Sequence, residues 1–156
     1  MGENIYFQCR KKAALSNDRL NSRSGAAEYL GISESSLTHY ELGITKNIPA
    51  DVVVTMAELY NAPELKNHYC RNECPIGKNL PIATEETPIA LATIHLLENL
   101  NPDVIKNYSN ELIKIASDGN VTADEALQLN EMLDALDKVT KAASELRILA
   151  EKHSKE

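Results

Sequence analysis

The sequence predicts an all-α protein, with a five-helix N-terminal domain followed by a C-terminal helical hairpin or bundle that ends in a long helix. Two observations support this prediction. Hydrophobic residues make up 43% of the 156 residues, but aromatic residues only 4% with no Trp, so the core must be aliphatic. Apolar residues also recur at alternating intervals of three and four along the last thirty residues, which is typical of a helix that packs against other helices.

Residues 23–43 read as two short helices joined by a tight turn. Ala26 and Ala27 give the first helix a small apolar side. Gly31 can adopt the positive φ that ends a helix, and Ser33 is a good N-cap for the second helix. Because small residues let a second helix cross closely, this stretch has the features of a helix-turn-helix.

The second helix has an apolar and a polar face. Leu37 and Tyr40 point to one side, and the opposite face carries Glu34, Ser35, Thr38 and His39. A polar face directed outward is what a recognition helix requires.

Residues 5 to about 70 resemble the phage repressor/Cro-type helix-turn-helix domain of the XRE family. The resemblance rests on residues spread over five helices: Arg10, Gly31-Ile32-Ser33, Leu37, Glu41, Gly43, Pro49 and the run Met56-Ala57-Glu58-Leu59-Tyr60. It implies a five-helix repressor-like fold that binds double-stranded DNA. It also implies an ion pair between Arg10 and Glu41, which would tie the first helix to the third.

The resemblance further implies which residues meet DNA. The family's base-contacting positions correspond to Glu34, Ser35 and His39, with Thr38 close enough to help. Phosphate contacts would come from Arg23, which stands where the family often has Gln, and from the loop residues Thr45, Lys46 and Asn47. The polar stretch 16–22 is longer than the family's usual turn, and we expect it to be a loop.

Charge is unevenly distributed along the chain. Residues 1–80 hold nine Lys or Arg and nine Asp or Glu, whereas residues 81–156 hold seven and fourteen, so the whole net charge of −7 lies in the second half. The acidity therefore does not oppose DNA binding by the first half. Since that half is not strongly basic, we expect a shallow salt dependence.

The sequence indicates neither an enzyme nor a membrane protein. It has no Gly-rich phosphate loop and no recognisable Ser/His/Asp order, and we expect no cofactor. No stretch of about 18 apolar residues occurs, and no signal-peptide core is present, so we expect a cytoplasmic location.

Three cysteines, an odd number, argue against a disulfide framework. Cys70 and Cys74, with His68 nearby, leave three readings open: a metal site, a redox-sensitive pair, or structural thiols. A zinc site needs a second pair of ligands, and Cys9 lies on the apolar side of the first helix. We therefore expect no metal.

The sequence predicts three segments along the chain: a DNA-binding domain over residues 1–76, a hinge over 77–87, and an acidic helical domain over 88–156. In the last of these, Asn101-Pro102 opens a helix, and Thr122 with Glu125 forms a capping box before the final helix.

The final helix predicts a dimer. Its heptad positions are apolar: Leu129, Met132, Leu136, Val139, Ala143 and Leu146. Additional apolar residues widen this stripe beyond what one neighbouring helix can cover. We expect it to pack on its own chain on one side and on a second subunit on the other; the alternative is a hairpin without a partner.

Two functions from different classes follow. The first is a homodimeric, sequence-specific transcriptional regulator. The second is a protein-interaction module whose acidic C-terminal helices bind another regulatory protein while DNA affinity is weak.

Overall fold

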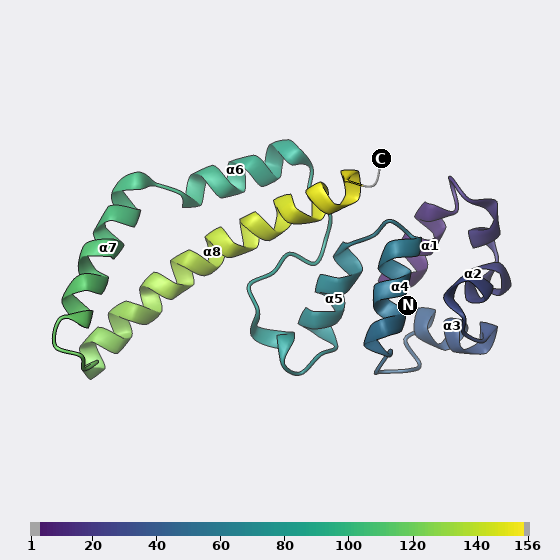
Figure 1. Cartoon of the computed structure of the whole chain (residues 1–156), viewed down its shortest axis with the longest axis horizontal. Coiled ribbons are helices and arrows are strands. Elements are labelled where there is room, and N and C mark those ends of the chain that lie inside the picture. The colour runs from purple at the N-terminus through teal and green to yellow at the C-terminus, as the bar shows by residue number, and fades with distance from the viewer. Residues whose placement is uncertain (1–3, 155–156) are drawn as a thin grey trace. The chain divides into compact units, whose positions relative to one another are not determined.

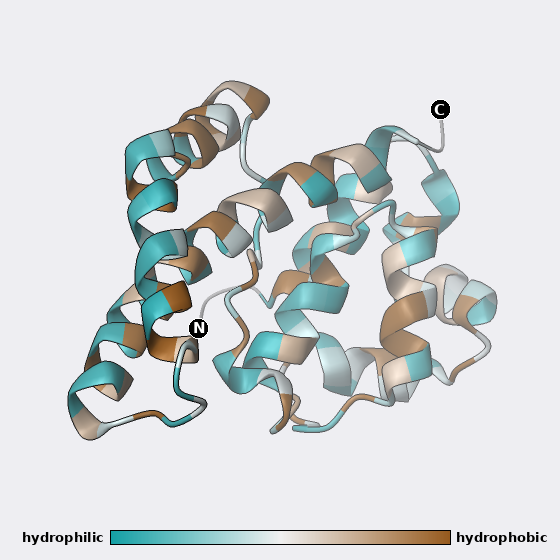
Figure 2. Ribbon diagram, turned by 60° about the vertical axis from the view of Figure 1, so that its left-hand side comes forward, coloured by the Kyte–Doolittle hydropathy of each residue, from teal (hydrophilic) through white to brown (hydrophobic). Residues whose placement is uncertain are grey.

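The computed structural model describes residues 4–154, and within them all regular structure is helical, so the all-α prediction is confirmed. The helices, drawn in Figure 1, are α1 (Ile5–Ala13), α2 (Arg23–Leu30), α3 (Glu34–Glu41), α4 (Ala50–Leu59), α5 (Glu64–Asn72), α6 (Ile89–Asn99), α7 (Pro102–Ala116) and α8 (Ala123–His153). Two short 3-10 helices, η1 (Asp18–Asn21) and η2 (Gly77–Asn79), lie between them. Hydrophobic and hydrophilic residues alternate along the helices, as amphipathic packing requires (Figure 2).

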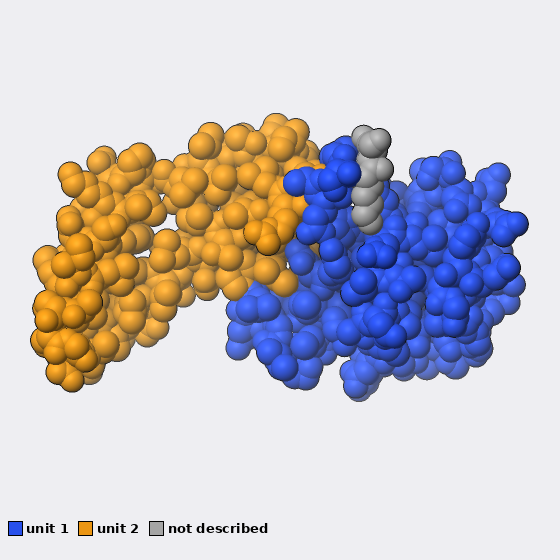
Figure 3. All heavy atoms as spheres, viewed as in Figure 1, with its two compact units in different colours: residues 1–80, 150–156 blue, residues 81–149 orange. Residues whose placement is uncertain are grey.

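The chain forms two compact units (Figure 3). Of the described residues, unit 1 comprises 4–80 and 150–154, and unit 2 comprises 81–149. The boundary after residue 80 lies within the expected hinge, residues 77–87. Residues 150–154, which the sequence placed in the acidic C-terminal domain, lie in unit 1.

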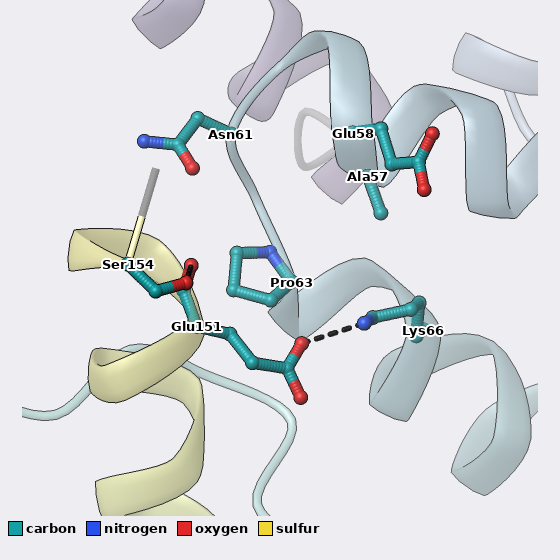
Figure 4. A pocket seen from close by; sticks show the side chains of 7 residues that line it. All are labelled: Ala57, Glu58, Asn61, Pro63, Lys66, Glu151 and Ser154. Atoms are coloured by element: carbon teal, nitrogen blue, oxygen red, sulfur yellow. Dashed lines mark hydrogen bonds and ion pairs between the residues drawn. The ribbon is translucent and has the colours of Figure 1, made fainter. Parts of the chain in front are cut away.

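The end of α8 belongs to unit 1 because it is bonded to α5 and to the turn after α4. Lys66 Nζ lies 2.6 Å from Glu151 Oε2, and Asn61 Nδ2 donates to the Lys152 carbonyl at 3.4 Å. Asn61, Lys66 and Glu151 border an open hollow of about 160 Å³, in which the Lys66–Glu151 pair is visible (Figure 4). None of these contacts is local in sequence, so the helical pattern of α8 did not reveal them.

The core of unit 1 is largely aliphatic, with Tyr6 and Tyr60 also buried, and is supplied by α1 to α5 and by η1. Its most buried members include Tyr6, Leu20, Leu37, Val53, Met56 and Leu65. The α4–α5 connection is tight because Asn61 adopts a positive φ of 48°, which Asn tolerates better than most residues.

Residues 16–22 are not the polar loop that their composition suggested. Asp18–Asn21 form a 3-10 helix, and Leu20 within it is almost completely buried. The Asn17 side chain caps this turn by accepting from the Arg19 amide. A single apolar residue among polar neighbours was enough to anchor the segment to the core.

The expected hinge is also more ordered than its prolines and polar residues suggested. Gly77 is buried, and an added Cβ there would lie 2.2 Å from the Cys70 carbonyl oxygen, so this position needs glycine. Within unit 2, Ala83 is buried, and its amide donates to Ser144 Oγ at 3.0 Å. Residues on both sides of the unit boundary are therefore held in place.

In unit 2 the predicted helix starts are confirmed. The Asn101 side chain accepts from the Asp103 amide, with Pro102 following as the first helical residue of α7. At the start of α8, the Thr122 amide donates to Glu125 Oε2 at 2.8 Å, while the Glu125 amide donates to Thr122 Oγ1 at 3.3 Å. This is the reciprocal pattern of a capping box.

The heptad residues of α8 are partly covered by their own chain. Met132 is buried, and Leu129, Leu136, Val139 and Leu146 are half-buried; Leu136 and Val139 line a hollow with α7 residues. Much of the stripe expected to form a dimer is thus already in use within unit 2.

The heptad prediction is wrong at Ala143. This residue is exposed, whereas its neighbour Ala142 is buried. The buried face of α8 turns along its length as its neighbours change. Around Val139 the neighbour is α7, but Ser144 bonds to Ala83, and Glu145 pairs with His95 of α6 at 2.8 Å. A helix that meets successive partners need not keep one heptad seam.

The three cysteines are free and differ in accessibility. Cys9 is buried beside Glu64, and burial raises the pKa of its thiol to about 12. Cys70 and Cys74 are half-buried. No group of three or more His, Cys, Asp or Glu side chains among residues 4–154 is arranged to hold a metal ion.

We predict that a maleimide at neutral pH modifies Cys70 and Cys74 in the folded protein before Cys9. The thiolate is the reactive species, and burial disfavours it at Cys9. Mass spectrometry of peptides from a labelling time course measures the order. Cys9 should react at the rate of the other two only in denaturant; equal rates in native buffer would contradict this assignment.

Candidate nucleic-acid interface

The connection between α2 and α3 is built from local hydrogen bonds. Ser22 Oγ caps α2 by accepting from the Gly25 amide at 3.0 Å. Gly31 then adopts a φ of 64°, the left-handed conformation that lets the chain leave α2. Ser33 Oγ caps α3 by accepting from the Ser36 amide at 3.0 Å. These caps fix where α3 begins and therefore which of its residues face outward.

One side of α3 is buried and the other is accessible. Leu37 is completely buried in the core, whereas Glu34, Ser35 and His39 are exposed. Thr38 is half-buried, and its hydroxyl donates to the Glu34 carbonyl at 2.8 Å. Three of the four predicted base-contacting residues, Glu34, Ser35 and His39, therefore have exposed side chains. Thr38 has its hydroxyl proton engaged and offers mainly its methyl group and hydroxyl lone pairs.

The structure contains the ion pair between Arg10 and Glu41 that the family resemblance implies. Arg10 Nε donates to Glu41 Oε1 at 2.5 Å and Nη2 donates to Oε2 at 2.9 Å, with both side chains almost completely buried. Arg10 Nη1 donates to the carbonyls of Leu20 and Asn21. The hydrogen bonds to Glu41 raise the pKa of Arg10 against the opposing effect of burial. This pair fixes the C-terminal end of α3 to α1.

Arg23 adds a second guanidinium to the same carboxylate. Its Nε donates to Glu41 Oε2 at 2.7 Å, and about a third of its side chain is exposed. Two arginines share one glutamate, so the cluster of Arg10, Arg23 and Glu41 has a net charge of +1. Arg23 is its solvent-accessible member. The family resemblance implied a phosphate contact for Arg23; the structure shows that its Nε braces α3 through Glu41, which the sequence did not indicate.

The predicted phosphate-contacting loop directly follows α3. Gly43 turns the chain with a φ of 67°, and the Ile44 amide donates to the His39 carbonyl at 2.9 Å. Lys46 and Asn47 are exposed and Thr45 is half-buried. The loop thus begins at the C-terminal end of α3 and is held to it by a backbone hydrogen bond.

Two supporting residues were missed at the sequence level. Asn4, the residue before α1, donates through Nδ2 to the Tyr40 carbonyl at 3.1 Å. This bond secures the C-terminal end of α3. The Phe7 ring lies 5.4 Å from the Arg10 guanidinium and 5.9 Å from that of Arg23. Phe7 precedes Arg10 by three residues, so both lie on one side of α1, and this spacing was the available signal.

Comparison with known proteins gives no independent identification. No family model, curated protein or solved structure matches this chain. No helix among residues 4–154 is long and apolar enough to cross a bilayer. The functional inference therefore depends on the geometry around α3 and on the residues that resemble the repressor/Cro family.

Proposed function

We propose that this chain is a sequence-specific DNA-binding transcriptional regulator of the repressor/Cro type, cytoplasmic and acting as a homodimer. The observation that supports it best is the position of α3. The helix exposes Glu34, Ser35 and His39 while its opposite side and its C-terminal end are anchored by Leu37 and Glu41. A rigid helix with an accessible polar face can enter the major groove.

Each exposed side chain has a chemically suitable partner on DNA. A Glu34 carboxylate accepts from cytosine N4, Ser35 can pair with several base edges, and a protonated nitrogen of His39 donates to guanine. The half-exposed Arg23 and the exposed Lys46 supply positive charge beside this helix for phosphate oxygens. The face has no arginine or glutamine to form a bidentate base contact, so discrimination depends on several modest contacts together.

An acidic surface in unit 2 favours a second candidate function. Residues 81–149 contain five Lys or Arg and twelve Asp or Glu, a net charge of −7. Such a surface suits a basic region of another regulatory protein, which would make the chain an interaction module with weak DNA affinity. The two functions differ in what they require of α3, because only the first needs a base-reading face.

Selection from a pool of random duplexes at low salt, about 50 mM, tests the proposal. The full-length protein should enrich a motif with two-fold symmetry and half-sites about one helical turn apart, since a symmetric dimer presents two recognition helices. The variant Lys46→Ala should enrich the same motif with lower recovery. A pool without any enriched motif would reject the DNA-binding proposal and favour the interaction module.

A further inference from the structure

Helix α6 in unit 2 is apolar on both of its sides. Its inner side contains the fully buried Ala92, and the half-buried His95 bonds to Glu145 of α8. On the outer side Ile89 is 63% exposed, Ile94 50% and Leu97 66%. The outer side of α6 therefore presents an exposed apolar face in unit 2.

The outer side of α6 carries little charge. Between Ile89 and Asn99 the only Asp, Glu, Lys or Arg is Glu98, which is exposed and lies beside Ile94 at the edge of the face, although the unit as a whole has a net charge of −7. Two copies of an acidic unit repel one another wherever their carboxylates are opposed. The α6 face is where a second copy meets the least of this repulsion.

We propose that the outer face of α6 is a homodimer interface, on which α6 of a second copy packs across a two-fold axis. A two-fold contact requires a surface that is complementary to itself. The face provides this, because the small side chains of Ala90 and Thr93 lie between the larger Ile89, Ile94 and Leu97. Small residues at the crossing allow close approach, while the large ones fill the space beside them.

The exposed area of the face suits a modest contact. Ile89, Ile94 and Leu97 together present on the order of 300 Å² of surface per copy. Two copies would bury about 600 Å² through these side chains, the size of a weak, concentration-dependent interface.

This inference rests on the proposed function, since a regulator that reads two half-sites needs a second copy. It moves the interface from the α8 heptad positions to α6. The exposed apolar residues Ile113 of α7 and Leu127 of α8 serve as matched controls, because they are 70% and 65% exposed but lie on other helices.

Sedimentation of the full chain without DNA tests the interface. At about 20 µM the wild type should sediment as a dimer of the 17.2 kDa chain, and Ile94→Asp/Leu97→Asp as a monomer, its dimer dissociation constant raised roughly 100-fold or more. The control Ile113→Asp/Leu127→Asp should remain dimeric. A monomeric wild type, or dimers lost in the control but kept in the α6 variant, would overturn the proposal.

A second variant keeps the test decisive if the aspartates disturb folding. With Cys70 and Cys74 replaced by serine, Thr93→Cys places a thiol near the expected two-fold axis, so mild oxidation should link two chains covalently, whereas Leu127→Cys in the same background should not. Equal cross-linking by both variants would contradict the proposed axis. Failure of the two proposals is distinguishable: a dimer that enriches no DNA motif rejects DNA binding and leaves the α6 interface standing, whereas a monomer that enriches a motif rejects the homodimer and its α6 interface and leaves DNA binding by α3 standing.

Discussion

Replacing Arg10 with alanine should lower the free energy of unfolding of unit 1 by about 3 kcal/mol, because removing one partner of a buried ion pair leaves a buried charge uncompensated. Glu41 would keep only Arg23, which is partly exposed to solvent. The carbonyls of Leu20 and Asn21 would also lose their guanidinium donor. The first loss acts on the end of α3 and the second on η1, so DNA binding should fall together with stability.

Urea denaturation monitored by circular dichroism measures this change. Lys11→Ala is the matched control. The Lys11 side chain is adjacent to Arg10 in sequence, is exposed and donates to the same Asn21 carbonyl, so its loss should cost less than about 0.5 kcal/mol. Arg10→Lys keeps the charge but cannot reproduce the paired Nε and Nη2 bonds, so it should fall between the two. Equal midpoints for Arg10→Ala and the wild type would show that the buried pair does not stabilise the unit.

Leu37→Ala should destabilise unit 1 by about 2–5 kcal/mol, the cost of removing a large buried side chain and leaving a cavity. Leu37 has no exposed surface and fixes the inner side of α3 against the core, where α3 contacts α1 and α2. Loosening this contact removes the rigidity that base reading needs, so sequence preference should also weaken at temperatures where the variant is still folded.

Leu42→Ala is the control for this substitution. Leu42 follows α3 directly and undergoes the same chemical change, but it is 59% exposed. Its loss should therefore cost a fraction of the Leu37 value, as measured by thermal unfolding at one protein concentration. Similar melting temperatures for the two variants would mean that α3 is not anchored through Leu37.

Local features of this fold could be predicted from the sequence. Gly31 and Ser33 delimit α2 and α3, and Thr122 with Glu125 starts α8, because a cap depends only on residues within one turn of it. The pairing of Arg10 with Glu41 is not local. It was expected only because the surrounding residues resemble a known family.

Features that depend on distant contacts could not be predicted. Leu20 lies in a polar stretch, and its burial follows from how η1 meets the core. The heptad spacing of α8 suggested one continuous dimer stripe, yet its neighbours change from α7 to α6, and the buried face turns with them. The bond between Arg23 of α2 and Glu41 of α3 could not be predicted for the same reason, because it joins residues of two different helices.

We propose that α3 reads bases whereas Lys46 contacts only the phosphate backbone. The affinities of the wild type and two variants for a selected duplex and for a scrambled one, measured over a range of salt concentrations, test this proposal. Ser35→Ala/His39→Ala should reduce the preference for the selected duplex by about tenfold or more. Lys46→Ala should weaken both duplexes alike and lower the salt slope by about one. Uniform weakening by both variants, with the preference unchanged, would contradict base reading by α3.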